Sequence, residues 1–432
     1  MPRRQLSIAI LLGMALCASL PAQTGPASDN TYVRRDLVVN RYAADDPTSP
    51  PQAPLIDPLL VNPWGAAIRT AGLGGHFWLA NAGSATVTTY VGDVYDESGQ
   101  FIPLFQDDLK FVAVEGSAIG QVFSASPGDF PVTGPLCTDD SLDTCDAAQG
   151  PAFLGEFTGP SRFIVATEEG QIAAWAEGTL NGQFGRMRAF VTVLDHADQG
   201  ALYRGLAVTE YESGNRLYAA NFSQGQIEVY NSHWRRARWA WDGDDVVQPF
   251  RKPADVPANY VPFNIQYLNG LLYVAYAELI QPADPDYSPE EPFTERACPG
   301  CGYIAVFDQR GIHIQTFAGQ GRLNAPWGMA IAPATFGRFG NALLVGNFGD
   351  GTIVAFDPAT GAQIDYLRDA AGQVIRIDGL WAIFFGNGAS LGRADFLYWT
   401  AGFNDETDGG FGSLHYTGTA NPDPPIASAS AP

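Results

Sequence analysis

Residues 345–353 read VGNFGDGTI, and two other stretches follow the same plan, LANAGSATV at residues 79–87 and AANFSQGQI at residues 219–227. Each begins in an apolar strand, continues through a polar turn led by asparagine, and ends in the first residues of a second strand. In that second strand apolar and variable positions alternate, as in IVAF at residues 353–356. Such alternation is typical of a strand with one face in a core. The chain therefore repeats an antiparallel two-stranded unit.

A third strand precedes each unit, and a fourth follows several of them. The preceding strand carries Pro-Trp-Gly at residues 63–65 and 326–328, and Gly-Leu-Trp at residues 379–381. The candidates for the outer, fourth strand are residues 187–194, 313–317 and 363–367. Four-stranded antiparallel units repeated along a chain predict an all-β fold of the β-propeller type.

The repeated units predict six four-stranded blades. The blades are centred on residues 63–105, 115–195, 204–250, 260–318, 326–368 and 378–418. A segment with strand character at residues 37–42 has no blade of its own. We expect it to supply the outer strand of the last blade, which closes the ring and removes an exposed edge. The alternative is seven blades, with residues 122–157 forming part of an extra blade.

The two ends of the chain are predicted to lie outside a single propeller domain at residues 31–418. Residues 1–22 combine a basic start, a short apolar run and small residues near Ala22, which is the pattern of a secretory signal peptide. An amino-terminal anchor helix is the alternative, but the run is short for a membrane span. Residues 419–432 are rich in proline, alanine and serine, and are predicted to be disordered. We therefore expect a secreted or periplasmic protein without a membrane span.

The chain is strongly acidic, with 46 Asp and Glu residues against 24 Lys and Arg residues and a formal net charge of −22. Such a charge repels phosphate backbones, so we expect no nucleic-acid partner. It also disfavours anionic membrane surfaces and helps to keep an exported monomer in solution. The sequence contains neither the H-E-x-x-H motif of metalloproteases nor a phosphate-binding glycine loop.

Four cysteines follow the leader as two close pairs, Cys137 with Cys145 and Cys298 with Cys301. An even number of cysteines at short spacing in an exported chain predicts disulfides. The first pair lies between the first and second strands of its blade, and the second pair between the second and third strands. The two pairs should therefore lie on opposite faces, which favours the bridges Cys137–Cys145 and Cys298–Cys301. A redox motif would normally open a helix, and a zinc site would need a second pair or histidines nearby.

Propeller geometry also sorts polar residues by face, because the loop into the first strand and the turn between the second and third strands share one face. The residues assigned to that face are Asn62, Asn81, Glu168, Asn221, Asn324, Asn347 and Asp378. Amide and carboxylate oxygens suit a hard cation such as Ca²⁺, and the candidate metal ligands are Glu168, Asn221, Asn347 and Asp378. The alternative is that asparagine tolerates left-handed backbone at these turns and caps its own loop. The recurring tryptophans either stack a ligand such as a sugar or pack between blades as core aromatics.

Several longer stretches resemble a family of exported bacterial β-propellers related to NHL-repeat and gluconolactonase-like folds. The matching segments are VNPWG at residues 61–65, FNIQ at 263–266, LNAPWG at 323–328, NFGDGTI at 347–353, IDGLW at 377–381 and TAGFNDE at 400–406. Many members of that family end in a sorting tail with a Pro-Glu-Pro motif and an apolar anchor, which this chain does not show. The resemblance implies a propeller fold and no assigned activity.

Two functions from different classes follow from these residues. The first is an exported binding or interaction module that uses the polar face to hold a small molecule, a glycan or a protein. The second is a metal-dependent hydrolase of the lactonase (gluconolactonase-like) kind, with Glu168, Asn221, Asn347 and Asp378 as metal ligands. The hydrolase requires these four side chains to converge on one point.

Overall fold

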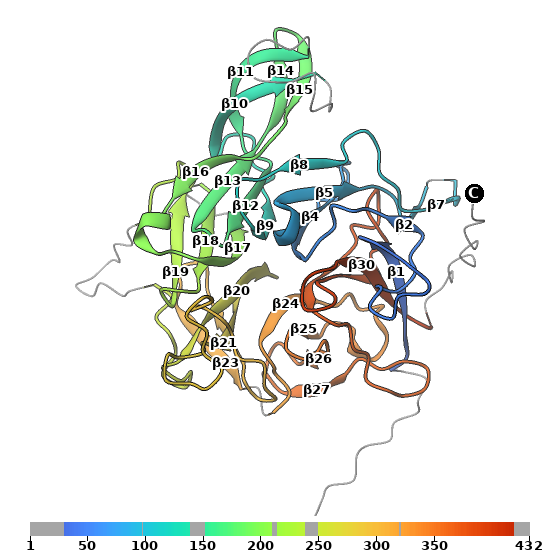
Figure 1. Ribbon diagram of the computed structural model, residues 1–432, viewed down its shortest axis with the longest axis vertical. Coiled ribbons are helices and arrows are strands. Elements are labelled where there is room, and N and C mark those ends of the chain that lie inside the picture. Colours follow the sequence, from blue (N-terminus) through green and yellow to red (C-terminus); the bar gives the residue numbers. More distant parts are fainter. Residues whose placement is uncertain are drawn as a thin grey trace, which may run out of the picture.

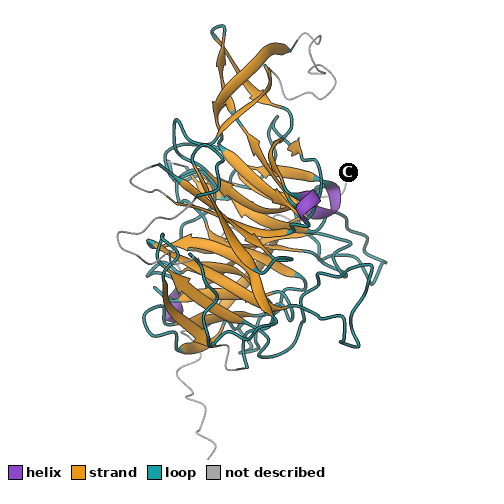
Figure 2. Ribbon diagram, turned by 90° about the vertical axis from the view of Figure 1, so that its left-hand side faces the viewer, coloured by secondary structure: helices purple, strands orange, loops and turns teal. Residues whose placement is uncertain are grey.

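The computed structural model describes residues 30–96, 98–138, 152–209, 214–237, 249–318 and 321–418. Almost all of these residues form strands and the loops between them (Figure 2). Their helical elements are three short 3-10 turns, η2 (Ala82–Ser84), η3 (Ala197–Gln199) and η4 (Gly337–Phe339). Within the described residues no helix is long and apolar enough to cross a membrane.

The first half of the chain forms three antiparallel sheets in succession. Their strands are β3 (Pro63–Ala67), β4 (Phe77–Asn81), β5 (Thr86–Tyr90) and β8 (Phe111–Ala113); β9 (Ala118–Phe123), β12 (Phe163–Thr167), β13 (Gln171–Trp175) and β16 (Val191–Asp195); and β17 (Tyr203–Thr209), β18 (Arg216–Asn221) and β19 (Gln226–Asn231). The third sheet has three strands in the described part of the chain, and residues 238–248 after β19 lie outside that part.

The second half continues the same pattern with two four-stranded sheets and the strands of the last sheet. They are β20 (Tyr260–Leu268), β21 (Leu271–Glu278), β22 (Tyr303–Phe307) and β23 (His313–Ala318); β24 (Pro326–Ile331), β25 (Leu343–Asn347), β26 (Ile353–Phe356) and β27 (Gln363–Tyr366); and β28 (Leu380–Phe385), β29 (Phe396–Ala401) and β30 (Gly410–Tyr416). The predicted outer strands at residues 313–317 and 363–367 are confirmed as β23 and β27.

The sheets surround a common centre, as in a β-propeller (Figure 1). The first strand of each sheet contacts the first strand of the next, in the circular order β3, β9, β17, β20, β24, β28 and back to β3. A close approach of the inner strands requires small residues. A Cβ at Gly120 of β9 would lie 2.8 Å from the Cα of Gly205 in β17, so Gly120 does not accommodate a larger residue without a shift.

The amino-terminal strand closes the last sheet, as predicted. β1 (Tyr32–Val39) pairs antiparallel with β30, from Tyr32 opposite Tyr416 to Val39 opposite Gly410. A short strand, β2 (Leu55–Ile56), adds to β1 in parallel. The strand begins earlier than the predicted residues 37–42 and ends at Val39, where the chain bends at Asn40.

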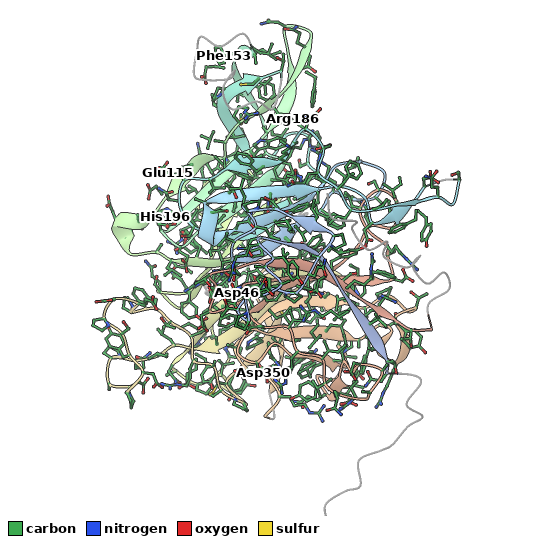
Figure 3. All side chains as sticks on the ribbon, turned by 45° about the vertical axis from the view of Figure 1, so that its right-hand side comes forward. Asp46, Glu115, Phe153, Arg186, His196 and Asp350 are labelled. Carbon is green, nitrogen blue, oxygen red and sulfur yellow. A yellow bond between two sulfur atoms is a disulfide. The ribbon has the colours of Figure 1, made fainter. Side chains whose placement is uncertain are left out.

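A separate four-stranded sheet projects from the body at the top of Figure 1, and Phe153 and Arg186 mark it in Figure 3. Its strands are β10 (Pro131–Cys137), β11 (Phe153–Pro160), β14 (Glu177–Leu180) and β15 (Gln183–Met187). Part of the segment 122–157, which the seven-bladed alternative places in an extra blade, therefore lies in this projection. The predicted outer strand at residues 187–194 was wrong in its bounds: Met187 ends β15, and the outer strand is β16. A small hairpin, β6 (Val94–Tyr95) with β7 (Phe101–Ile102), completes the strands.

Aromatic side chains from the innermost strands fill the centre of the ring. The rings of Trp64 and Trp381 stack with their centroids 3.3 Å apart, and Trp327 meets both edge-on at 5.9 Å. Phe222 and Phe263 belong to the same buried cluster. The tryptophans are thus core aromatics, as one alternative held, but they pack against one another on the axis instead of between blades. Trp64, Trp327 and Trp381, which we call the aromatic floor, lie beneath one open end of the ring, which we call the mouth.

A candidate ligand pocket at the propeller mouth

A pocket of about 510 Å³ lies above this aromatic floor. Trp64 lines its base, and Glu168, Arg204, Glu295 and Glu406 line its walls. The walls come from the turn between β12 and β13, the start of β17, the loop between β21 and β22, and the loop between β29 and β30. All of these segments belong to the two loop classes that propeller geometry places on one face. Residues 290–295 of the β21–β22 loop all line the pocket, and we call this loop the roof loop.

Arg204 is the buried cation of this pocket, with 8% of its surface exposed. Its Nη1 donates to the Glu168 carboxylate, and its Nη2 donates to the Phe293 carbonyl at 3.4 Å. The guanidinium lies 4.8 Å from the centroid of the Trp64 ring, within the range of a cation–π contact. A buried charge is costly unless it is paired with an opposite charge. The carboxylate of Glu168 provides that opposite charge for the Arg204 guanidinium.

Glu406 reaches the pocket from a left-handed turn. Asn404, Asp405 and Glu406 have successive φ values of 53°, 51° and 64°. Left-handed backbone costs roughly 1–2 kcal/mol per residue, although asparagine and aspartate tolerate it better than other side chains. The buried carboxylate of Asp408 holds the turn, because it accepts hydrogen bonds from Arg41 at 2.7 Å and from the Asn404 amide at 2.6 Å. Strained backbone held by such a network often marks a functional site.

The carboxylates of the mouth affect one another's protonation. Burial and the nearby charge of Glu295 together raise the pKa of Glu406 to about 7, although a hydrogen bond from Asn62 opposes the shift. Burial likewise raises the pKa of Glu295, and this effect exceeds the opposing attraction of Arg204. Glu406 therefore exchanges its proton near neutral pH. The pocket holds more acidic groups than its one guanidinium neutralises.

The three asparagines of the repeated turns are fully buried. Asn81 donates to the Thr88 hydroxyl at 3.1 Å, and Asn347 donates to the Arg322 carbonyl at 2.8 Å. The side-chain oxygen of Asn221 accepts hydrogen bonds from the Ser223 hydroxyl and the Gln224 backbone N–H of its own turn, and its amide nitrogen donates to the Glu228 carboxylate at 3.2 Å. Their amides thus organise the turns, which is what the turn-capping alternative describes.

Asn62 and Asn324 support the mouth from below. Asn62, itself left-handed with φ of 48°, accepts a hydrogen bond from Trp381 Nε1 at 3.0 Å and donates to Glu406. Asn324 is buried, and its backbone N–H donates to the side-chain oxygen of Asn347 at 3.0 Å. Asn62 is thus the predicted asparagine that contacts an acidic residue of the pocket.

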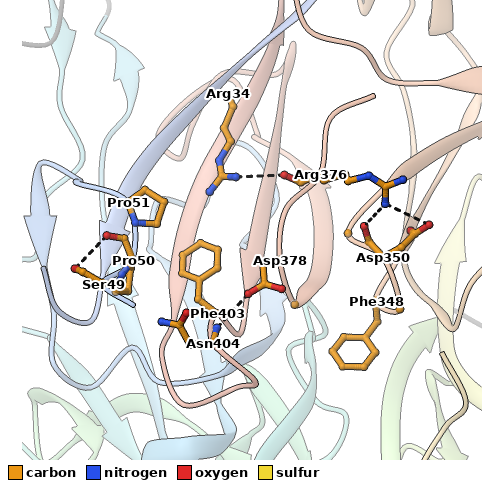
Figure 4. Close-up of a pocket in the computed structure, with 13 residues that line it drawn as sticks. Arg34, Ser49, Pro50, Pro51, Phe348, Asp350, Arg376, Asp378, Phe403 and Asn404 are labelled. Atoms are coloured by element: carbon orange, nitrogen blue, oxygen red, sulfur yellow. Dashed lines mark hydrogen bonds and ion pairs between the residues drawn. The ribbon is translucent and has the colours of Figure 1, made fainter. Parts of the chain in front are cut away.

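Asp378 is exposed and lies in a different pocket, of about 420 Å³, shown in Figure 4. It accepts a hydrogen bond from the backbone of Asn404 at 3.1 Å, and Arg34, Asp350 and Arg376 line the same pocket. Glu168 therefore lines one pocket and Asp378 another, while Asn221 and Asn347 are buried in their turns. The structure does not bring the four predicted metal ligands together.

Arg204, Glu295 and Glu406 were not singled out from the sequence. Glu406 ends the TAGFNDE stretch, and the adjacent Asn404 and Asp405 are residue types that enter left-handed backbone. The sequence therefore contained an indication of a left-handed turn next to Glu406. Arg204 is the first residue of the predicted third blade, and it lies in β17. Glu295 lies in a loop with no recognisable pattern, and only the tertiary structure places it at the mouth.

Residues 388–392 read GASLG and match the G-x-S-x-G pattern of hydrolase nucleophiles, which the sequence interpretation overlooked. They lie in the loop between β28 and β29, where the pattern would require a strand-to-helix turn. The side-chain oxygen of Asn387 instead accepts the backbone N–H groups of Ser390 and Leu391. The pattern is thus a hydrogen-bonded turn.

The predicted disulfide between Cys298 and Cys301 is confirmed, with Cα atoms 5.2 Å apart. It lies at the end of the roof loop of the mouth pocket. Cys137, the last residue of β10, is also disulfide-bonded. Its predicted partner Cys145 lies outside the described residues.

No protein-family model matches the chain. Two curated proteins of Acanthamoeba polyphaga mimivirus are similar to it along most of its length. Uncharacterized protein R648 is 29% identical over 84% of this chain and 77% of its own length. Uncharacterized protein L690 is 28% identical over 83% of this chain and 81% of its own length. These relatives are viral, whereas the resemblance described above is to a bacterial family.

Solved structures with similar folds have low sequence identity to the chain. A virginiamycin B lyase from Staphylococcus aureus is 11% identical and covers 89% of this chain and 99% of its own, with a TM-score of 0.40. The WD40 β-propeller domain of Doa1 is 9% identical, and the match covers 82% of this chain and 93% of that domain, with a TM-score of 0.37. Neither likeness carries a functional argument.

Proposed function

We propose that this chain is an exported, six-bladed β-propeller that binds a cationic ligand in the pocket formed by Glu168, Arg204, Glu295 and Glu406. The circular contacts of the six first strands and the closure by β1 support the blade count. The observation that carries the binding proposal is the convergence of these side chains from four separate loops above an aromatic floor. Export and a monomeric state remain proposals from the sequence.

The charge balance of the pocket favours a cation as the ligand. Arg204 is already paired with Glu168, and among the described residues no ion pair joins an arginine to Glu295 or Glu406. A cation above Trp64 would gain attraction from these carboxylates and from the aromatic ring. An ammonium or guanidinium group, on a small molecule or on a protein side chain, meets both requirements.

Calcium is less well matched to this pocket than an organic cation. Among the described residues, one group of three histidine, cysteine or acidic side chains has its ligand atoms within 4.8 Å of one another, and it does not include the mouth carboxylates. A Ca²⁺ ion needs six to eight oxygen ligands at 2.3–2.6 Å, roughly, and would require these loops to move.

Isothermal titration with agmatine, spermidine, CaCl₂ and neutral monosaccharides tests the proposal. We expect the organic cations to bind, and we expect the Glu295→Gln/Glu406→Gln variant to bind them at least tenfold more weakly, about 1.4 kcal/mol. Asp378→Asn, which alters an acid in the other pocket, is the matched control. Equal binding by the double variant, or no binding of either cation, would overturn the proposal.

Hydrolysis by acid–base catalysis is the second candidate, and the raised pKa of Glu406 beside Glu295 favours it. A group with a pKa near 7 is suited to donate and accept protons in catalysis. The metal-dependent lactonase alternative gains no support from the placement of its four ligands. Assays with lactone and glycoside panels would support hydrolysis if Glu406→Gln abolished turnover and left binding intact.

A further inference from the structure

The carboxylate of Glu278 lies beside the Cys298–Cys301 pair, a proximity that no sequence pattern predicts. One carboxylate oxygen of Glu278 and the two sulfur atoms are all within 4.8 Å of one another. Glu278 is the last residue of β21, whereas the two cysteines lie just before β22, at the far end of the intervening loop. Cys301 is buried and the other two residues are half-buried. Three potential ligands therefore meet where the loop begins and ends.

Backbone hydrogen bonds hold the two cysteines independently of their sulfur–sulfur bond. The Cys301 N–H donates to the Cys298 carbonyl at 2.9 Å, which closes the turn. The Gly300 N–H donates to the Leu323 carbonyl at 2.7 Å, and the Ala325 N–H donates to the Cys301 carbonyl at 3.0 Å. Gly300 has φ of 90°, which only glycine adopts readily. These backbone hydrogen bonds should therefore maintain the turn when the Cys298–Cys301 disulfide is reduced.

Glu278 is also held in place by its neighbours. Its Oε1 accepts from Asn259 Nδ2 at 3.1 Å and from Arg296 Nε at 3.3 Å, and its Oε2 accepts from the Tyr260 hydroxyl at 3.3 Å. Hydrogen bonds of this kind orient a carboxylate ligand in metal sites. Each carboxylate oxygen has two lone pairs, so Oε2 can still bind a metal ion.

We propose that Cys298, Cys301 and Glu278 form a binding site for a soft divalent metal ion, such as Zn²⁺, when the disulfide is reduced. A C-x₂-C pair is a common chelate of zinc sites, and a carboxylate is an accepted third ligand. Thiolate ligands select such ions over Ca²⁺ or Mg²⁺. With three protein ligands, the fourth coordination position is open to water or another ligand.

The chemistry requires a reductant, which we take to be a dithiol. The dithiol supplies two electrons and two protons: the S–S bond breaks, Cys298 and Cys301 become thiols, and the dithiol becomes a disulfide. The metal ion then displaces the two thiol protons, which are released to solvent. Either cross-link, the disulfide or the metal ion, closes the roof loop of the mouth pocket. The loop would therefore stay closed in oxidising and reducing compartments alike.

Cobalt titration of the reduced protein tests this site without reference to the mouth ligand. The full chain carrying Cys137→Ser and Cys145→Ser is reduced with a phosphine and is then kept anaerobic. In this reduction water supplies the oxygen of the phosphine oxide and the two thiol protons. We expect one Co²⁺ per chain, with sulfur-to-cobalt charge-transfer absorption that Zn²⁺ abolishes. The oxidised protein should show neither.

Two variants and one control make the outcome decisive. Cys298→Ser should eliminate the charge-transfer band of the chelate, and Glu278→Gln should weaken Co²⁺ binding at least tenfold. Asp286→Asn, which alters another acid paired with Arg296, should bind as the parent does. Absence of a 1:1 complex, unchanged binding by Glu278→Gln, or loss of the β-sheet circular dichroism signal on reduction would overturn the proposal.

Discussion

The side-chain amide of Asn62 donates a hydrogen bond to the carboxylate of Glu406 at 2.5 Å, across 344 positions of sequence. Asn62 precedes the first inner strand, and Glu406 precedes the last strand of the final sheet. The same asparagine accepts the indole N–H of Trp381. The acidic mouth and the aromatic floor are thus joined through one residue at the closure of the ring.

Replacing Asn62 with alanine should raise the pKa of Glu406 further, because the lost hydrogen bond favours the charged carboxylate. The variant should also be less stable by about 2 kcal/mol, since it loses buried hydrogen bonds and places alanine in left-handed backbone. Carboxyl-carbon NMR titration of Glu406 checks the pKa, and urea unfolding checks the stability. An unchanged or lower pKa would contradict the role assigned to Asn62.

The contribution of Glu406 to the stability of the protein should fall as the pH rises from about 4.5 to about 7. Burial raises the pKa of Glu406 from 4.5 to about 7, so in this interval the native state keeps a proton that the unfolded state has released. The loss amounts to at most about 3 kcal/mol by the end of the interval. Urea unfolding at several pH values should show a shallower decline for Glu406→Gln, and that variant should be the more stable one at pH 7. Parallel curves for the two proteins would argue against this shift.

Removing Glu168 should cost more than removing the Glu168–Arg204 pair. Glu168→Gln leaves the buried Arg204 guanidinium without its carboxylate, and we expect a loss of about 2 kcal/mol, below that of fully buried pairs because Glu168 is partly exposed. Arg204→Met/Glu168→Gln should recover part of the loss. The measurement is a double-mutant cycle by chemical denaturation; additive effects would mean that the pair is not coupled.

Deleting residues 23–43 should cause aggregation or a markedly lower melting temperature. The deletion removes β1, which leaves β30 with an unpaired edge, and it also removes Arg41, which holds Asp408 beneath the 404–406 turn. Deleting residues 421–432 is the control and should have little effect. A truncated chain as stable as the mature protein would show that the ring closes in another way.

Peptide mapping of the unreduced protein should find Cys298 linked to Cys301 and Cys137 linked to Cys145. The first link is present in the structure. The second is expected because the two cysteines are close in sequence and Cys137 is already disulfide-bonded. A peptide that joins Cys137 to Cys298 or Cys301 would refute the assignment of the two pairs to opposite faces.

The repeat pattern by itself determined the all-β fold, the inner, central and outer strands, and the use of an amino-terminal segment to complete the last sheet. These features were predictable because strand patterns and turn residues are local: IVAF at residues 353–356 is apolar throughout and must be buried wherever the strand lies, and all four residues are buried in β26. The projecting sheet was missed for the converse reason. Its strands β10 and β15 are far apart in sequence and meet through pairing that no local pattern records.

The mouth pocket was decided by the tertiary structure. The sequence favoured asparagines because they recur, but recurrence reflects the backbone needs of each turn, and Asn81, Asn221 and Asn347 are buried there. Glu295 and Glu406 lie in single, non-repeated loops, and they meet because the closed ring brings loops from different blades to one axis. Their altered protonation arises from that burial and proximity, which are properties of the assembled ring and not of any segment.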